Sequence, residues 1–212
     1  MYSVAACARI YWATATFNTL KRLKTAGNHP KTTMQTKDIL HFWFEELTGI
    51  QHFAKDAALD EAIRTRFGAT LDAAARCELL GWRTTAEGRL AEIIVLDQFS
   101  RNVYRDTPRA FAQDSRALAL AQELVASGQD SALSPAQRRF AYMPYMHSES
   151  PLIHAQAVQL FAQPGLEDGL NFELRHQAII DRFGRFPHRN AVLGRASTLE
   201  EIAFLNEPGS SF

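Results

Sequence analysis

The sequence predicts an all-α fold of about eight or nine helices, and three observations support this prediction. Residues that cap helices recur along the chain, followed by proline or by an acid, as in Ser134-Pro135, Ser150-Pro151 and Thr198-Leu199-Glu200-Glu201. The apolar residues behind these positions recur at the spacing of one helix face. No run of β-branched and aromatic residues shows the alternation that is typical of a strand.

The first half of the chain should contain four helices. Residues 37–47 form the first, and residues 57–80 form the second, with a break near Gly68. A capping box of Thr84 and Glu87 opens a helix over 85–99. Thr107-Pro108 places proline at the first position of a helix over 108–127, which Gly128 ends.

The second half should contain helices at 135–147, 151–162, 167–183 and 199–206, with a short one near 189–195. Pro144 should kink or end its helix, because proline lacks the backbone donor. Gly184 should end the helix before it in a left-handed conformation. Because the connections are short, neighbouring helices should pack as antiparallel pairs. Such an array leaves a concave face that is lined by one helix of each pair.

Composition limits the class of protein. The chain has 212 residues, 46% of them hydrophobic and 22% charged, which fits one globular domain and excludes a collagen, a disordered acidic chain and a disulfide scaffold. The 23 Lys and Arg residues balance 23 Asp and Glu residues, so net charge does not indicate a nucleic-acid partner. The two cysteines, Cys7 and Cys77, form no CxxC pair, and a reducing cytoplasm is the expected compartment.

The N-terminal segment differs in charge from the rest of the chain. Residues 1–37 contain six of the 23 Lys and Arg residues and no acid, so residues 38–212 carry 17 cations against 23 acids, a net charge of −6. The leader fits a targeting segment, a membrane-surface helix or sequence upstream of a start at Met34, and we favour the last. We therefore predict that residues 1–33 are a basic leader, disordered or not translated, and that residues 34–212 form a single helical domain. No apolar run is long enough for a membrane span.

Three segments contain more polar chemistry than core packing requires. The first is 97–105, where Asp97 and Arg101, Gln98 and Asn102, and Arg101 and Arg105 are four residues apart and share a helix face. Gln and Asn beside two Arg are typical of a recognition surface. The alternative is a solvated helix end, where arginine complements the helix dipole.

The second segment, 142–149, ends in His147 and Glu149, which form a candidate acid–base or ligand pair. The alternative is that Glu149 only caps the next helix. The third segment, 176–190, concentrates positive charge in an acidic domain, and a short helix after Pro187 should offer free N–H groups to an anion. The alternative is a corner whose arginines pair with acids elsewhere. Its candidate residues are His176, Arg182, Arg185, His188, Arg189 and Asn190.

At these segments the chain resembles a family of uncharacterised proteins, a domain of unknown function that is widespread in bacteria. The matching stretches are LDQFSRNVYR (96–105), RRFAYMPYMHSE (138–149) and RFGRFPHRNAVLGR (182–195). The resemblance covers about residues 38–212 and implies a tetratricopeptide-like all-helical fold, but no activity. Ser100 and Asp106 stand where the family often has proline and glycine, and Asp106 is expected to weaken the charge of Arg105.

Two functions follow from these residues. In the first, the concave face binds an anionic small molecule or a peptide carboxylate. Its expected ligand-binding residues are Gln98, Arg101, Asn102, Arg105, Arg182, Arg185, His188, Arg189 and Asn190. In the second, the protein is an enzyme that acts on such a ligand through acid–base residues, with His147, Glu149, His176 and Asp97 as candidates.

Other classes receive less support. RNA binding ranks below both functions, although Phe183 and Phe186 alternate with arginines. The chain has no HxxxH or HExxH motif, no phosphate-binding glycine loop and no GxSxG motif. We therefore predict no metal and no cofactor.

Overall fold

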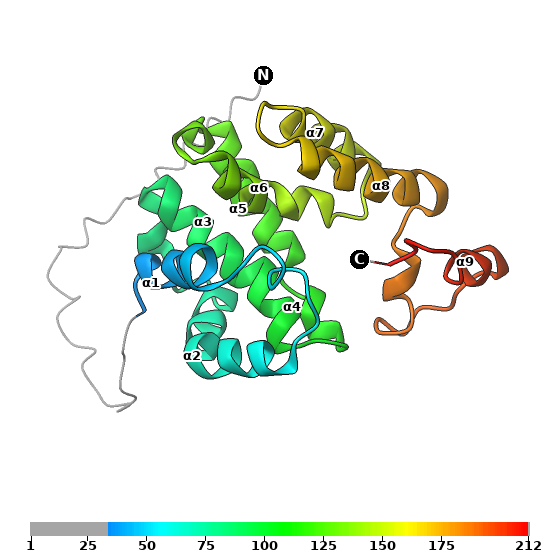
Figure 1. The fold of residues 1–212 in the computed structure, drawn as a ribbon, viewed down its shortest axis with the longest axis horizontal. Coiled ribbons are helices and arrows are strands. Elements are labelled where there is room, and N and C mark those ends of the chain that lie inside the picture. The colour runs from blue at the N-terminus through cyan, green and yellow to red at the C-terminus, as the bar shows by residue number, and fades with distance from the viewer. Residues whose placement is uncertain (1–33, 212) are drawn as a thin grey trace, which may run out of the picture. The chain divides into compact units, whose positions relative to one another are not determined.

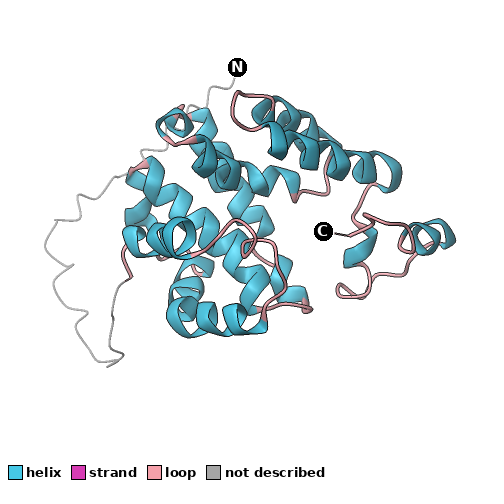
Figure 2. Cartoon of the chain, viewed as in Figure 1, coloured by secondary structure: helices cyan, strands magenta, loops and turns pink. Residues whose placement is uncertain are grey.

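The computed structural model describes residues 34–211, and within this range all regular secondary structure is helical, with loops and turns between the helices (Figure 2). The predicted all-α fold is confirmed, and these residues form no strand. The leader predicted for residues 1–33 lies outside the described residues. No helix in the described range is long and apolar enough to cross a membrane.

The α-helices follow one another with short connections (Figure 1). They are α1 (Thr36–His41), α2 (Ala57–Ala75), α3 (Ala86–Ile94), α4 (Ser100–Val103), α5 (Asp114–Ala126), α6 (Pro135–Met146), α7 (Pro151–Phe161), α8 (Glu167–Phe183) and α9 (Leu199–Phe204). Two π-helical turns, η1 (Phe42–Glu46) and η3 (Val95–Phe99), extend α1 and α3. The 3₁₀ turns are η2 (Leu80–Thr84), η4 (Pro108–Phe111), η5 (Gln129–Ala132) and η6 (Pro187–Arg189).

Several predicted caps are confirmed. Ser134 and Thr198 each accept a hydrogen bond from the backbone N–H three residues later, and Gln137 and Glu201 complete the two capping boxes. Gly184 ends α8 with a φ of 68°, in the left-handed region that glycine adopts without strain.

Other boundaries differ from the prediction. The α2 helix runs through Gly68 without a break and ends at Ala75. The α3 cap is Thr85, which accepts a hydrogen bond from the Gly88 N–H, so the predicted box on Thr84 is wrong. Pro144 lies inside α6, which continues for two more residues, so the helix does not end at the proline.

The helices pack around one main core. The α5, α6, α7 and α8 helices contact one another in succession, while α1 packs on α3, and α2 packs on α4 and η3 (Figure 1). Trp43, Phe67, Phe99, Tyr142 and Phe161 are its largest fully buried side chains. A smaller cluster of Ile179, Ile180, Phe186 and Phe204 joins α8 to α9. The tetratricopeptide-like pairing of helices stays a prediction.

The η3 turn determines which side chains reach the site. Its five residues lie between α3 and α4 without a break in the helical path, and all five are buried. A π-helical turn contains one residue more than an α-helical turn, and such turns occur frequently at functional sites. Asp97 and Gln98 belong to this turn, so the polar segment 97–105 begins inside the core rather than at a solvated helix end.

Candidate functional site

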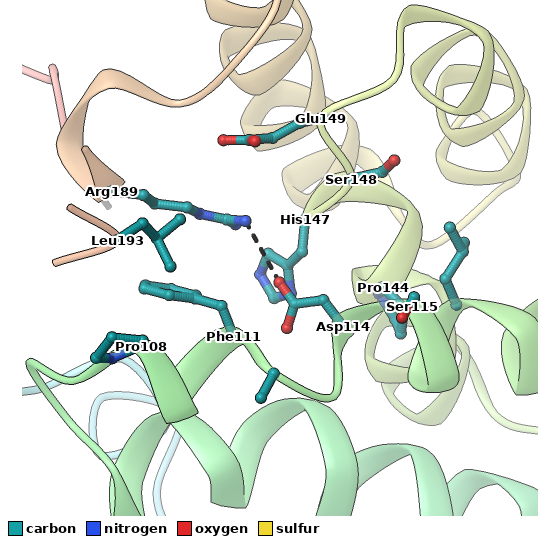
Figure 3. A pocket seen from close by; sticks show the side chains of 12 residues that line it. Pro108, Phe111, Asp114, Ser115, Pro144, His147, Ser148, Glu149, Arg189 and Leu193 are labelled. Atoms are coloured by element: carbon teal, nitrogen blue, oxygen red, sulfur yellow. Dashed lines mark hydrogen bonds and ion pairs between the residues drawn. The ribbon is translucent and has the colours of Figure 1, made fainter. Parts of the chain in front are cut away.

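The polar segments meet at two adjoining cavities. The larger has a volume of about 670 Å³ and the smaller, shown in Figure 3, about 390 Å³. Phe111, His147 and Arg189 line both cavities. Of the predicted site residues, the larger cavity contains Gln98, Arg101, Asn102, Arg105, His147, His176, His188 and Arg189.

Three helical stripes form much of the larger cavity. The first contains Gln98, Arg101, Asn102 and Arg105, the second contains Arg139, Met143, Met146 and His147, and the third contains Phe172, Arg175 and His176. Each stripe contains the i, i+3, i+4 spacing of one helix face. The stripes belong to η3 with α4, to α6 and to α8, and Arg105 and His147 lie just beyond the ends of α4 and α6.

Positive charge dominates the lining of the larger cavity. Among residues 34–211, six Lys or Arg side chains line it against one carboxylate, that of Asp106. The cations are Lys55, Arg101, Arg105, Arg139, Arg175 and Arg189. Three carboxylates behind the lining, Asp60, Asp97 and Asp114, pair with Arg101, Arg105 and Arg189.

Arg101 and Arg105 are held by these carboxylates. Arg101 binds Asp114 through two hydrogen bonds of 2.9 and 3.0 Å, and its guanidinium lies 3.1 Å from an Asp97 oxygen. Arg105 binds Asp60 through bonds of 2.6 and 2.7 Å. The expected weakening of Arg105 by Asp106 therefore comes instead mainly from Asp60, which is 45 positions away in the sequence.

Arg189 is paired less completely. It is 6% exposed, and its recorded polar side-chain contact is one hydrogen bond of 3.3 Å to Asp114, a carboxylate that Arg101 already occupies (Figure 3). Its Nε atom is buried and has no hydrogen-bond partner among residues 34–211. Burial and the neighbouring charge of Arg101 lower the pKa of Arg189 from 12.5 to about 10. Its guanidinium packs against the rings of Phe111 and Phe186, which fixes its position.

His147 forms a dyad with Asp97. The His147 Nδ1 atom lies 2.8 Å from an Asp97 oxygen, and Gln98 donates to the other oxygen of that carboxylate. Burial alone would raise the pKa of Asp97, but Arg101, His147 and Gln98 outweigh it and hold that pKa well below its usual range. Asp97 is therefore ionised and accepts a hydrogen bond from His147 Nδ1–H.

The protonation state of His147 follows from this geometry. Burial, and then the charge of Arg101, lower the pKa of His147 below 6.5, while Asp97 opposes the shift. The imidazole is neutral at neutral pH, with its proton on Nδ1 and the lone pair on Nε2. Because no hydrogen-bond partner of Nε2 occurs among residues 34–211, the arrangement suits a general base at the wall shared by the cavities.

Two further histidines line the larger cavity, and both have lowered pKa values. His176 Nδ1 binds the carbonyl oxygen of Phe172, and burial lowers the pKa of His176 to about 3. Burial, followed by the charge of Arg189, lowers the pKa of His188 to about 4. Both imidazoles are therefore neutral at physiological pH and add polar groups rather than charge to the cavity.

Glu149 lies in the smaller cavity and is not the partner of His147. It binds the Arg195 guanidinium at 2.6 and 3.0 Å and accepts a hydrogen bond of 2.8 Å from the Phe186 N–H. The predicted pair of His147 and Glu149 is replaced by His147 and Asp97. The cap alternative for Glu149 is not seen either, because the backbone group that it binds belongs to residue 186 and not to α7.

Three predicted ligand-binding residues do not line either cavity. Arg182 pairs with Glu200, and Arg185 binds Glu201 through two hydrogen bonds of 2.6 and 2.8 Å. Asn190 is fully buried and binds Ser197 and Arg195. Arg182 and Arg185 thus connect the end of α8 to α9. This agrees with the alternative prediction, in which the arginines of this corner pair with acids elsewhere in the chain.

At least one of the N–H groups that were expected to be free near His188 and Arg189 has a backbone partner. The η6 turn is only three residues long. The Arg189 N–H donates to the Phe186 carbonyl and the Asn190 N–H donates to the Pro187 carbonyl. Arg189 therefore contributes its side chain to the cavity, and its own N–H is not free to bind an anion.

Several residues that line the larger cavity were not predicted from the sequence, chiefly Arg139, Arg175, Phe172 and Phe53. Helical spacing could have found the first two, because Arg139 stands four residues before Met143 and eight before His147, and Arg175 stands next to His176. No local signal marks Phe53, which lies in the loop before α2. No group of three or more His, Cys, Asp and Glu side chains in the described range is arranged to hold a metal ion.

Comparisons with known proteins place these features in a family. A family model described as a bacterial protein of unknown function (DUF924) matches residues 39–209. The chain is similar to a solved structure of a protein of unknown function from Agrobacterium tumefaciens, with 40% sequence identity and a TM-score of 0.77 over 81% of this chain and 96% of that chain. A comparison with curated proteins found no match. The chain thus belongs to the DUF924 family of bacterial proteins of unknown function.

Proposed function

We propose that the larger cavity binds a small anionic ligand, a carboxylate or phosphate carried by a small molecule or a peptide end. The observation that carries this proposal is Arg189, a buried guanidinium that shares the Asp114 carboxylate with Arg101 and whose Nε has no hydrogen-bond partner in the described part of the chain. A buried charge without full compensation is costly, and an anion in the cavity would supply the missing charge.

The other lining residues support this proposal. Arg139 and Lys55 add positive charge, and Gln98 and Asn102 offer amide groups. The volume of about 670 Å³ lies within the usual range for small-molecule sites. Positive charge is enclosed in a cavity rather than spread along an open surface, so we place nucleic acid below a small ligand. The low cysteine content supports a cytoplasmic location for this function.

Titration with inorganic phosphate and with acetate, followed by calorimetry and thermal unfolding, tests the proposal. We expect both anions to bind the wild-type protein and raise its Tm, and Arg189→Met to abolish both effects. Arg182→Met is the matched control, because Arg182 is an exposed arginine outside both cavities. Binding that is equal in the wild type and in Arg189→Met, or no binding to the wild type, would overturn the proposal.

The dyad of His147 and Asp97 favours a second candidate function, hydrolysis of an anionic ester. His147 Nε2 would take a proton from water while the water oxygen attacks the carbonyl carbon or the phosphorus atom. The leaving oxygen would then receive that proton, which restores the neutral imidazole. Arg101 and Arg189, within the same cavity, would stabilise the developing negative charge.

Turnover of p-nitrophenyl phosphate, an anionic ester, tests this candidate, with the neutral ester p-nitrophenyl acetate as the comparison that should react more slowly. Because the pKa of His147 is lowered, the rate should rise with pH along a titration curve whose midpoint lies below pH 6.5. The rate should then level off at higher pH. His147→Gln should remove the activity without loss of phosphate binding. Activity that persists in His147→Gln would exclude the dyad as the general base.

A further inference from the structure

The larger cavity has an aromatic edge. Nine large hydrophobic side chains are exposed among residues 34–211, and two of them, Phe53 and Phe172, line this cavity. They are also the two aromatic members of that group, with exposed fractions of 55% and 41%. Exposed aromatic rings at the opening of a cavity mark a surface that a ligand can cover.

A guanidinium group connects the two rings. Arg139 lies 5.1 Å from the ring centroid of Phe53 and 5.9 Å from that of Phe172. No carboxylate partner of Arg139 occurs among the described residues. The ring of Phe53 stacks against the ring of the buried Phe140, with an interplanar angle of 11°. Planar groups from three separate segments of the chain therefore meet at this edge.

The aromatic edge differs chemically from the part of the cavity that is proposed to bind the anion. Met143, Met146 and Val192 are apolar, and methionine adapts its shape to the group that it contacts. Arg189, Gln98 and Asn102 form the polar part of the same cavity. A simple anion such as phosphate would satisfy the polar part and leave the aromatic edge uncovered.

We propose that the ligand is an anion that carries an aromatic ring, with the ring stacked at Phe53, Arg139 and Phe172. This inference rests on the proposed anion site and names the ligand class for it. Flat rings stack favourably on phenylalanine rings and on guanidinium planes, and such stacking does not depend on a particular pattern of hydrogen bonds.

Two pairs of probes test the inference in the full-length protein: phosphate with phenyl phosphate, and acetate with phenylacetate. We expect each aromatic member to bind about ten-fold more tightly than its partner, which is about 1.4 kcal/mol. Phe172→Ala should reduce this ratio to about one and leave the affinity for phosphate unchanged. Leu174→Ala is the matched control, because Leu174 is a similarly exposed α8 residue outside the cavity, and it should keep the ratio.

The outcomes separate the two proposals. If phosphate and acetate bind but their aromatic derivatives bind no more tightly, the aromatic site is refuted and the anion site stands. If the preference for aromatic probes persists in Phe172→Ala, the ring is bound elsewhere and the inference fails. If none of the four probes binds the wild type, the proposed function itself is refuted.

Discussion

Arg189→Met should stabilise the protein while it removes anion binding. Most substitutions of buried residues destabilise a fold. Arg189 should behave differently, because it is a buried cation close to a second cation, Arg101, and shares a single carboxylate with it. A site that is built for an anion stores unfavourable free energy as long as the anion is absent.

The structure gives a magnitude for this effect. The pKa of Arg189 falls from 12.5 to about 10, which corresponds to about 3 kcal/mol of unfavourable free energy for the charged form. Methionine keeps apolar contact with Phe111 and Phe186, and Asp114 retains both hydrogen bonds from Arg101. We expect a net stabilisation of about 1–3 kcal/mol, which raises the Tm by about 3–9 °C for a domain of this size.

Urea denaturation and calorimetry at pH 7 in a buffer without phosphate measure this change. Arg105→Met is the matched substitution, because Arg105 lines the same cavity but binds Asp60 through two short hydrogen bonds. Loss of the Arg105 guanidinium leaves Asp60 with the hydrogen bond from Asn102 and should lower the free energy of unfolding by about 1–3 kcal/mol. If Arg189→Met loses stability as Arg105→Met does, Arg189 is a structural residue and the reasoning fails.

Four further predictions concern single substitutions in the fold. Asp97→Asn should lower the pKa of His147 further, because the Asp97 charge raises it, and a pH titration of the His147 ring signals by NMR would contradict this if the midpoint stayed or rose. Burial raises the pKa of Glu173 above its ordinary value of 4.5, so stability is present below pH 4.5 and is lost as pH rises through the folded-state pKa. Glu173→Gln should therefore gain stability relative to the wild type as pH increases from 4.5, and parallel stability curves from urea denaturation would refute this. Gly68→Ala should stabilise by about 0.5–1 kcal/mol, because the added Cβ meets nothing within 4 Å inside a helix. Gly88→Ala should lower the Tm instead, since its Cβ would overlap a neighbouring backbone carbonyl oxygen.

The sequence alone predicts those features that depend on a few adjacent residues. The capping boxes at Ser134 and Thr198 are local, because each joins a side chain to backbone three positions away. The end of α8 at Gly184 is local for the same reason. The predicted break at Gly68 fails because tertiary packing of α2 outweighs the weak helix propensity of one glycine.

The composition of the candidate site is predicted only in part, because the pairing of charges is a long-range property. Arg185 and Arg189 are equally good candidates in the sequence, yet the first binds Glu201 from α9 and the second reaches the cavity. Likewise, His147 has a carboxylate two positions away but pairs with Asp97, 50 positions away. The partner of each charged side chain depends on how its helix is oriented relative to the neighbouring helices. Residue spacing within one segment does not specify this orientation.

The π-helical turn η3 has a consequence for how this family of proteins diversifies. Deleting one residue from the turn would restore α-helical geometry and leave the following residues close to their present orientation, because five π-helical residues complete nearly the same rotation as four α-helical ones. Arg101, Asn102 and Arg105 would therefore stay in the cavity, and α3 before the turn would keep its place in the core. A change in length of a single codon could thus add or remove one side chain beside the site without moving the helices on either side of it.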